Sequence, residues 1–352
     1  MAHHDDPFGH GSLTDVAGLL VGHHQRRGAG WRTGTTVVLA PGGVVAGVDV
    51  RGGGPGTRET DALDARNLVD RIHAVCLTGG SAYGLAAADG VMAHLEGRRL
   101  GVPVGEHPHE VVPVVPTAVI FDLGRGGNFA NRPDPGFGRR AAAGARRGAG
   151  RGALGAGTGA RTAGLQGGVG MASTKVAIGA LTVTVAALAV VNASGSMIDP
   201  ATGLPWAAIG GLRRPSRDER RAVLDAIAAS RPAPLNTTIG VVATDADLTR
   251  PEAGRLAQSA HDGLARAVRP AHALFDGDTV FGLSTGRHPI DAPGDAANGI
   301  GRGIDSRAAR LNQLFAAAAA VFETSCADAL VTATGHPGTP SYRDLCASAF
   351  RV

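Results

Sequence analysis

The sequence of 352 residues is 43% hydrophobic and 18% charged, a composition typical of globular proteins and unlike that of disordered ones. Its formal net charge is +4, and Lys175 is the single lysine among many arginines. The densest arginine tract, residues 138–161, holds no aromatic side chain on which a nucleic-acid base could stack. We therefore interpret this tract as a solvated, glycine-rich loop and expect no nucleic-acid partner.

The cysteines and the apolar segments favour a reduced, cytoplasmic protein. The three cysteines, Cys76, Cys326 and Cys346, are an odd number without CxxC spacing, so we expect small core residues. The first residues show no basic region followed by an apolar stretch, as a secretory signal would. The most apolar segment, 176–195, carries threonines at alternate positions, which indicates a buried strand rather than a membrane span. We expect a cytoplasmic location and no membrane contact.

Strand and helix patterns alternate along the first third of the chain. Apolar residues at helical spacing predict a helix over 59–72 and another over 81–99, with Ser81 as its N-cap. Runs of β-branched and apolar residues predict strands between these helices and on either side of them. The expected strands are 35–40, 43–50, 73–80 and 116–124.

The remainder of the chain mixes the same two patterns. A Gly/Ala/Arg tract over 136–170 precedes an expected strand at 176–191, and prolines interrupt the chain over 231–235. Because strands and helices mix throughout and no repeat is visible, we predict a layered α/β or α+β fold. The other expected elements are helices at 216–230 (capped by Ser216), 248–268 (Pro251 in its first turn) and 305–330, and strands at 239–243 and 272–286.

Three motif matches are better explained by chance or by local structure. GRGALG, residues 150–155, spells a dinucleotide fingerprint but does not follow a strand, and the required acidic residue is missing. RGGGPGTRET, residues 51–60, lacks the ending of a phosphate loop, and HPHE, residues 107–110, is best read as a surface loop. We therefore expect neither a cofactor nor a metal ion.

The stretch PLNTTIGVV, residues 234–242, places Thr237 at the start of an apolar strand. A threonine hydroxyl is a poor nucleophile without a base, but the α-amine of an N-terminal threonine can serve as that base. Such an amine has a pKa of about 7.7–8.0. To expose it, Thr237 would attack the carbonyl of Asn236 and form an ester that water opens. The alternative is that Thr237 is an ordinary strand residue.

Two further motifs carry groups that suit this chemistry. In FDGDTVF, alternation along a strand would place Asp276 and Asp278 on one face, where their mutual repulsion favours a raised pKa or a cationic partner. An N-terminal ammonium is such a partner; the alternative is a solvated acidic turn. Asn192 ends an apolar strand and could donate to an oxyanion, although this residue taken alone favours the alternative of a simple turn residue before Ser194.

Taken together, these motifs resemble the self-processing L-aminopeptidase/D-esterase family, which includes β-aminopeptidases and nylon-oligomer hydrolases. The resemblance covers nearly the whole chain, and its most specific part is the pair NTT and DGDT. The motifs, in order, are LTDVAGLLVGH (13–23), CLTGGSAYGLAAADGV (76–91), VPTAVIFDLG (115–124), GAGTGA (155–160), GGVGMAS (167–173), NTTIGVVATDA (236–246) and DGDTVF (276–281).

The resemblance implies a single hydrolase domain over 1–352 that cuts itself into two associated chains, 1–236 and 237–352. It implies Thr237 as the nucleophile, Asp276 and Asp278 as acids near its amine, and Asn192 as the oxyanion-side amide. It also implies a four-layer αββα sandwich related to N-terminal-nucleophile hydrolases. Homo-oligomers of processed α/β heterodimers would be usual.

The chain departs from the family pattern at two positions. Gln166 stands where a lysine often precedes the GG-GxAS element, and Phe121 stands where nylon-oligomer hydrolases carry a tyrosine. Lys175 lies nine residues after Gln166 and is the one lysine that could replace the missing cation. We therefore expect a general aminopeptidase, amidase or esterase for small peptides or amides rather than a nylon-oligomer hydrolase. An acyltransferase with the same threonine, or a non-catalytic binding protein on this scaffold, are the alternatives.

Overall fold

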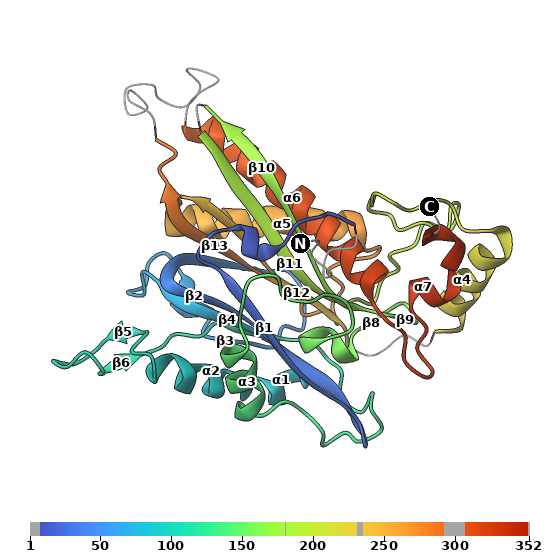
Figure 1. Ribbon diagram of the computed structural model, residues 1–352, viewed down its shortest axis with the longest axis horizontal. Helices are drawn as coiled ribbons and strands as arrows, with labels where there is room; N and C mark the ends of the chain where they lie inside the picture. Colours follow the sequence, from blue (N-terminus) through green and yellow to red (C-terminus); the bar gives the residue numbers. More distant parts are fainter. Residues whose placement is uncertain (1–7, 180, 231–234, 292–306, 351–352) are drawn as a thin grey trace.

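The computed structural model describes residues 8–179, 181–230, 235–291 and 307–350. Two β-layers are joined into one nine-stranded sheet, eight strands of which follow one another along a single path, because β2 is long enough to belong to both layers (Figure 1). Its first part pairs with β1 and β4, and its last residues, Val45–Val50, pair with β13. The strands of this path are β10 Gly168–Ile178, β11 Leu181–Asn192, β12 Thr237–Ala246, β13 Thr279–His288, β2 Trp31–Val50, β4 Ile72–Thr78, β7 Thr117–Val119 and β3 Thr57–Arg58, with β1 Leu20–Gly28 beside β2.

Helices cover the outer face of each layer (Figure 1). α5 and α6 pack on the β10–β13 layer, whereas α2 and α3 pack on the β1–β2–β4 layer. The order helix, sheet, sheet, helix is the predicted four-layer sandwich. The helices are α1 Ser81–Gly84, α2 Ala87–Glu96, α3 Pro135–Ala143, α4 Arg217–Ala229, α5 Arg250–Ala267, α6 Arg307–Thr332 and α7 Tyr342–Leu345, and the short hairpins are β5 Val102–Pro103 with β6 Val111–Val112 and β8 Arg161–Thr162 with β9 Leu165–Gln166.

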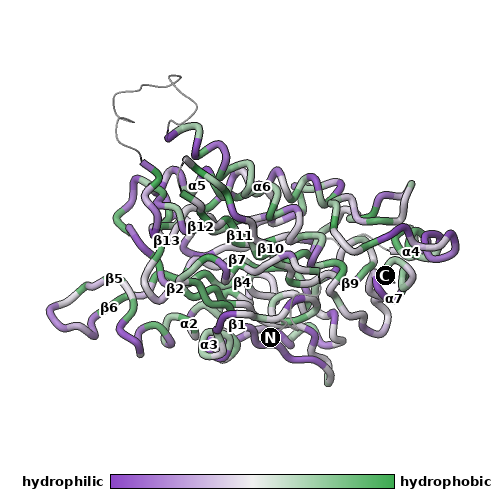
Figure 2. The backbone as a smooth tube through the Cα atoms, turned by 45° about the horizontal axis from the view of Figure 1, so that its top comes forward, coloured by the Kyte–Doolittle hydropathy of each residue, from purple (hydrophilic) through white to green (hydrophobic). Residues whose placement is uncertain are grey.

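Alternation along the central strands builds the core between these layers. In β11 the odd-numbered residues from Val183 to Val191 face α5 and α6, while Ala186, Leu188 and Val190 face the other sheet. Both faces of β11 are therefore buried, which explains why residues 185–191 are continuously apolar. Figure 2 shows the hydrophobic segments gathered in the central strands and the hydrophilic ones in the outlying turns.

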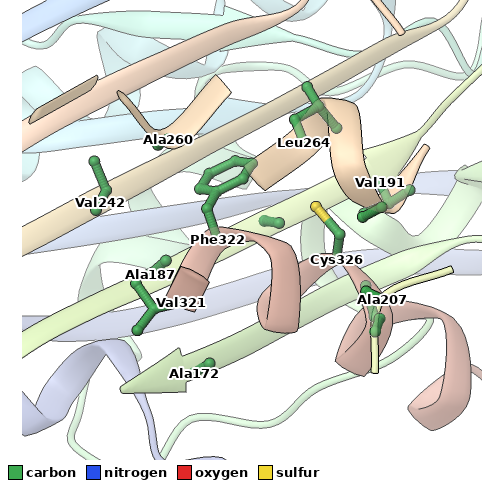
Figure 3. Close-up of a cluster of buried hydrophobic side chains, with 14 of the residues drawn as sticks. Ala172, Ala187, Val191, Ala207, Val242, Ala260, Leu264, Val321, Phe322 and Cys326 are labelled. Carbon is green, nitrogen blue, oxygen red and sulfur yellow. The ribbon is translucent and has the colours of Figure 1, made fainter. Parts of the chain in front are cut away.

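A close approach of helix and sheet fixes the position of α6. Phe322 is fully buried among small residues of α5 and the strands (Figure 3). A Cβ atom on Gly240 of β12 would come within 2.6 Å of the Phe322 ring. The glycine therefore makes room for the aromatic ring, and α6 packs directly on the strand that begins at Thr237.

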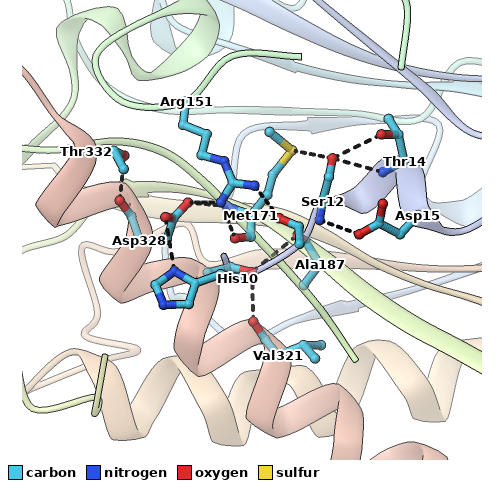
Figure 4. Close-up of polar contacts among 12 residues, drawn as sticks. His10, Ser12, Thr14, Asp15, Arg151, Met171, Ala187, Val321, Asp328 and Thr332 are labelled. Atoms are coloured by element: carbon cyan, nitrogen blue, oxygen red, sulfur yellow. Dashed lines mark hydrogen bonds and ion pairs between the residues drawn. The ribbon is translucent and has the colours of Figure 1, made fainter. Parts of the chain in front are cut away.

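A buried ion pair ties the first part of the chain to α6 (Figure 4). Arg151 Nη1 lies 2.9 Å from Asp328 Oδ2, and its side chain also donates to the carbonyl oxygen of Gly11. The same carboxylate accepts the backbone N–H of Met171 at 2.8 Å and faces His10 Nδ1 at 3.4 Å. Asp328 thus holds three separate segments of residues 1–236 against a helix of residues 237–352.

Several predicted elements are confirmed with their local signals. Ser216 caps α4 in a reciprocal capping box with Glu219, and Pro251 lies in the first turn of α5. The three cysteines are free and buried. Within the described ranges, α6 is long and apolar enough to cross a membrane, but 67% of its most apolar window is buried inside the protein, as in a core helix.

Two helix predictions are wrong in the first third of the chain. Residues 59–72 form only a 3₁₀ turn, Asp61–Leu63, because Asp64 binds the backbone N–H of Arg66 and Asn67 binds the Asp61 carbonyl. Such side-chain bonds compete with the helical ladder. The 81–99 helix is split into α1 and α2, and its N-cap is Gly80 rather than Ser81, whose φ is +52°.

The glycine-rich middle of the chain is more ordered than the sequence indicated. The predicted strand 176–191 is a hairpin, with β10 ending at Ile178 and β11 running from Leu181 to Asn192. The tract 138–161 is not a solvated loop, because it contributes most of α3 and a buried 3₁₀ segment, Gly155–Gly159. A Cβ on Gly157 would come within 2.6 Å of the Gly168 backbone, so this tract is glycine-rich to allow close packing.

Candidate active site

Thr237 is the first residue of β12 and lies directly opposite Asn192, the last residue of β11. Its side chain is buried, and Oγ1 donates a hydrogen bond to the carbonyl oxygen of Asn236 at 2.5 Å. Antiparallel pairing therefore brings the threonine and the asparagine to the same end of two neighbouring strands. The hydroxyl lies against the peptide bond that precedes it.

The turn Phe275–Asp278 holds that peptide bond from the other side. Gly277 donates its N–H to the Asn236 carbonyl oxygen at 3.1 Å, and Asn236 donates its own N–H to Phe275 O at 3.4 Å. The carbonyl of Asn236 thus accepts bonds from both Thr237 Oγ1 and Gly277 N. A backbone N–H so placed can stabilise negative charge on this oxygen. The proline-rich residues 231–234 lie outside the described residues.

Asp276 and Asp278 lie in this turn and not on a strand, because β13 begins only at Thr279. The prediction that alternation along a strand aligns them is therefore wrong, although both side chains are buried near Thr237. Asp278 Oδ1 accepts the Thr238 N–H at 2.7 Å, and Oδ2 lies 2.8 Å from His272 Nδ1. One carboxylate therefore faces the backbone beside Thr237.

Asp276 has different partners. Ser194 Oγ lies 2.9 Å from Oδ1 and 3.1 Å from Oδ2, and the Ala273 N–H donates to Oδ2 at 2.8 Å. Burial raises the pKa of Asp276 above its ordinary value, and the negative charge of Asp278 acts in the same direction. Asp276 therefore holds a proton more readily than an ordinary aspartate does, which suits it to proton transfer at this site.

The side-chain amide of Asn192 is held in one orientation. Its Oδ1 accepts the backbone N–H of Arg161 at 3.1 Å and a hydrogen bond from Arg125 Nη1, while Nδ2 faces Phe121 O at 3.3 Å. Donors on one side and an acceptor on the other assign the oxygen and the nitrogen of the amide. Phe121 thus contributes its backbone carbonyl rather than its ring.

Lys175 does not lie at this site. It pairs with Thr184 across the β10–β11 hairpin, and its Nζ donates to Thr184 Oγ1 at 2.7 Å. Thr184 is eight residues before Asn192 on β11, which at about 3.3 Å per residue is roughly 26 Å away. The possibility that Lys175 replaces the missing cation is therefore excluded by the register of the sheet.

Gln166 lies close to this end of the sheet but is occupied by structural bonds. Its amide Nε2 donates to the carbonyl oxygens of Ala160 and Gly167, each at 2.9 Å, and its Oε1 accepts from Arg32. The side chain is buried. Gln166 therefore fixes the segment beside Asn192 rather than presenting a group to a substrate.

A cavity of about 510 Å³ opens beside Asn236. It lies where the segment after β11, the end of α4 and the 338–340 segment meet. A volume of this size accommodates a small ligand. The lining residues are Arg125, Arg161, Ala163, Gly164, Ala193, Ser194, Ala226, Ala229, Ser230, Asn236, Gly338, Thr339 and Pro340.

The structure adds residues that sequence reasoning did not single out: Ser194, His272, Gly277, Arg125 and Arg161. Three of them were within reach of a local signal, since Ser194 and Gly277 adjoin the chosen residues and His272 precedes Asp276 by four. The two arginines had no such signal, because their approach to Asn192 spans 67 and 31 residues. Over the part of the chain described, no group of three or more His, Cys, Asp or Glu could hold a metal ion.

Known proteins share this sequence and fold. The model of Peptidase family S58 matches residues 11–342. An uncharacterized aminopeptidase of Mycobacterium tuberculosis (strain ATCC 25618 / H37Rv) is 47% identical over 351 residues, with 96% of this chain and 99% of the relative covered. A 6-aminohexanoate-oligomer endohydrolase of Kocuria sp. (strain KY2) is 31% identical over 296 residues, with 82% and 78% covered.

Solved structures show the same architecture at lower identity. A β-aminopeptidase of Burkholderia sp. superimposes with a TM-score of 0.69 at 23% identity, covering 99% of this chain and 96% of the other. The L-aminopeptidase D-Ala-esterase/amidase of Ochrobactrum anthropi, described as a variant of the Ntn hydrolase fold, gives 0.67 at 22% identity, with 95% and 91% covered.

The layered fold is therefore that of the N-terminal-nucleophile type of hydrolase, as the sequence predicted. The sequence relatives make the class more specific, since they are named as an aminopeptidase and a 6-aminohexanoate-oligomer endohydrolase. The chain belongs to peptidase family S58 and is a peptidase of the aminopeptidase type.

Proposed function

We propose that the protein is a self-processing aminopeptidase whose nucleophile is Thr237. The observation that carries this proposal is the contact of Thr237 Oγ1 with the carbonyl of its own preceding peptide bond at 2.5 Å. In the first step Oγ1 attacks the Asn236 carbonyl carbon, and the peptide nitrogen becomes the α-amine of Thr237 as the bond turns into an ester. Water then hydrolyses the ester to the Asn236 carboxylate and the free hydroxyl.

The described contacts supply what each step needs. Negative charge on the Asn236 oxygen develops where the Gly277 N–H already donates. After cutting, the new α-amine removes the proton from Oγ1 when a substrate carbonyl arrives. Asp278, bonded to the next N–H along the strand, lies beside that amine and favours its charged form, and the Nδ2 group of Asn192 donates to the substrate oxyanion.

The substrate class follows from the same site. The relatives' names refer to aminopeptidases and to an amide oligomer hydrolase, and the cavity beside Asn236 has room for a small peptide or amide. The protein therefore hydrolyses small peptides or amides through an ester on Thr237. Residues 1–236 and 237–352 remain associated, because β12 lies between β11 and β13 in one sheet.

Intact mass under denaturing conditions tests self-processing. We expect two species from the wild type, breaking between Asn236 and Thr237, and one full-length species from Thr237→Val, which has no hydroxyl. Thr238→Val is the matched control, because Thr238 is also buried in β12 but its hydroxyl has no hydrogen-bond partner in the described structure. Thr237→Ser should still cut. A Thr237→Val protein that is cut and active would exclude the proposed nucleophile.

A further inference from the structure

Among the described residues, the charged side chains that line the cavity beside Asn236 are all of one sign. Arg125 and Arg161 are the charged residues that line it, and the other lining residues are small or neutral side chains. An aminopeptidase is expected to neutralise a positively charged amino end, so a cavity walled by two guanidinium groups calls for a different explanation. The charge of this wall suits an anion.

In the part of the chain that the structure describes, no carboxylate lies at ion-pair distance from the guanidinium group of Arg125 or Arg161. Over the described residues, the side chain of Arg161 has no hydrogen-bond or ion-pair partner, and its Nε is buried. Arg125 uses Nη1 on Gly159 O and Asn192 Oδ1, but its buried Nη2 has no partner there. Buried N–H donors without a protein acceptor are costly, and they are found where a water molecule or a ligand supplies the acceptor.

A third arginine strengthens the positive charge behind the cavity wall. Arg32 is buried and bonds Thr339 Oγ1 at 3.1 Å, next to the lining residues. Burial lowers the pKa of both Arg32 and Arg125 to about 10, and the charges of the neighbouring arginines act in the same direction. The charge of Asp122 opposes this lowering and raises the pKa of both arginines. Asp122 accepts the Gly80 N–H at 2.7 Å, and burial raises its own pKa to about 6.

We propose that this cavity is a carboxylate-binding subsite in which Arg161 and Arg125 hold a free carboxylate of the substrate while the scissile carbonyl faces Thr237. The proposal rests on the proposed function and makes its substrate class more specific. A guanidinium group offers paired N–H donors that match the two oxygens of a carboxylate. The substrates are therefore short peptides or amides that carry a carboxylate in addition to the scissile bond.

Arg125 connects this subsite to the reaction centre. The same side chain that lines the cavity holds Asn192 Oδ1, and Asn192 lies opposite Thr237. A carboxylate bound in the cavity is thus separated from Asn192, the proposed oxyanion donor, only by the side chain of Arg125. This spacing fits a short substrate and not a long polymer whose only carboxylate is at a distant end.

Kinetics with matched acid and amide substrates test the subsite. The dipeptide Ala-Gly is compared with Ala-Gly-amide for a C-terminal carboxylate, and Glu-Gly-amide with Gln-Gly-amide for a side-chain carboxylate. We expect the acid of one pair to have at least a tenfold higher kcat/KM than its neutral partner, chiefly through KM. The pair that shows the preference identifies which carboxylate the cavity binds.

Arg161→Gln is the informative variant, because Arg161 touches Asn192 only through its backbone N–H, which the variant keeps. It should lower kcat/KM for the acid substrate at least tenfold more than for the neutral one, and Arg161→Lys should restore part of the preference. Arg66→Gln removes an equal charge from a fully exposed site and should leave the preference unchanged. Equal kcat/KM for acid and amide in the wild type, or equal losses in Arg161→Gln, would overturn the subsite.

A binding measurement separates this proposal from the proposed function. Calorimetric titration of N-acetylglycine against N-acetylglycinamide needs no turnover, and we expect the acid to bind at least tenfold more tightly to the wild type but not to Arg161→Gln. An uncut, inactive wild type that keeps this difference would overturn the hydrolase and leave the subsite. A cut, active wild type with no difference in either assay would overturn the subsite alone.

Discussion

Gly277 offers a way to move the nucleophile without changing its chemistry. A Cβ atom on Gly277 would lie 2.8 Å from Thr237 Oγ1 and 3.2 Å from its Cγ2, with the backbone oxygen of Gly54 at 2.9 Å on another side. Ordinary Cβ contacts begin at 3.4 Å, so Gly277→Ala must displace Oγ1 by about 0.6 Å, the difference between 3.4 and 2.8. The N–H that donates to Asn236 O is retained in alanine.

The expected effect is a slower self-cleavage. A misplacement of 1 Å at a reacting group costs about 100-fold in rate, so a shift of this size should slow cutting about tenfold or more. The assay is intact mass followed over time after synthesis, with thermal unfolding of the same samples to show that the variant is folded.

Gly54→Ala is the matched control for Gly277→Ala. Gly54 lies in the same turn region and donates its N–H to Asp276 O, but a Cβ there would meet nothing closer than 3.8 Å. It should therefore be cut at the wild-type rate. A folded Gly277→Ala protein that is also cut at the wild-type rate would refute the placement of Thr237 Oγ1 as the attacking group.

Three further predictions follow from buried contacts. Asp328→Asn removes one charge of the buried pair with Arg151 and should lower the free energy of unfolding by about 3–5 kcal/mol in denaturant titration, whereas a change within about 0.5 kcal/mol would contradict a structural role. His272→Ala removes a charge-assisted hydrogen bond to Asp278, worth about 1.5–3 kcal/mol, so kcat should fall about ten- to a hundredfold with KM little changed. His272→Asn should recover part of the lost kcat, and equal losses of kcat in both variants would count against a role for this bond. The pKa of Asp276 is raised in the folded state, so protonation of its carboxyl stabilises the fold. This stabilisation is complete at pH below the ordinary aspartate pKa of about 3.9, and it is lost as the pH rises through the raised pKa. Asp276→Asn should therefore gain in melting temperature relative to the wild type as pH rises from acidic to neutral, and a constant difference would show that Asp276 does not titrate in this way.

Local sequence signals were sufficient to predict a helix wherever the residues of that one segment determine its structure. Ser216 and Glu219 cap α4 through bonds within one turn, and Pro251 lies in the first turn of α5, so both helices could be predicted from a few neighbouring residues. By contrast, side chains within 59–72 form hydrogen bonds with backbone groups that a helix would have paired. The pattern of apolar residues in this segment did not reveal these bonds. The sequence is rich in apolar residues at the end of β10 and along β11, and this concealed the hairpin between the two strands.

The sequence by itself determined the layered class of the fold and the order of the motifs that hold Asn192, Thr237, Asp276 and Asp278. Only the tertiary structure decided how these groups meet, because the β11–β12 register places Asn192 opposite Thr237 and the turn before β13 gives each aspartate its own partners. The β10–β11 register placed Lys175 away from the site, and packing of the glycine-rich middle of the chain brought Arg125 and Arg161 into it. Capping and periodicity act over a few residues, whereas strand pairing and the burial of charged side chains join segments that are far apart in the chain.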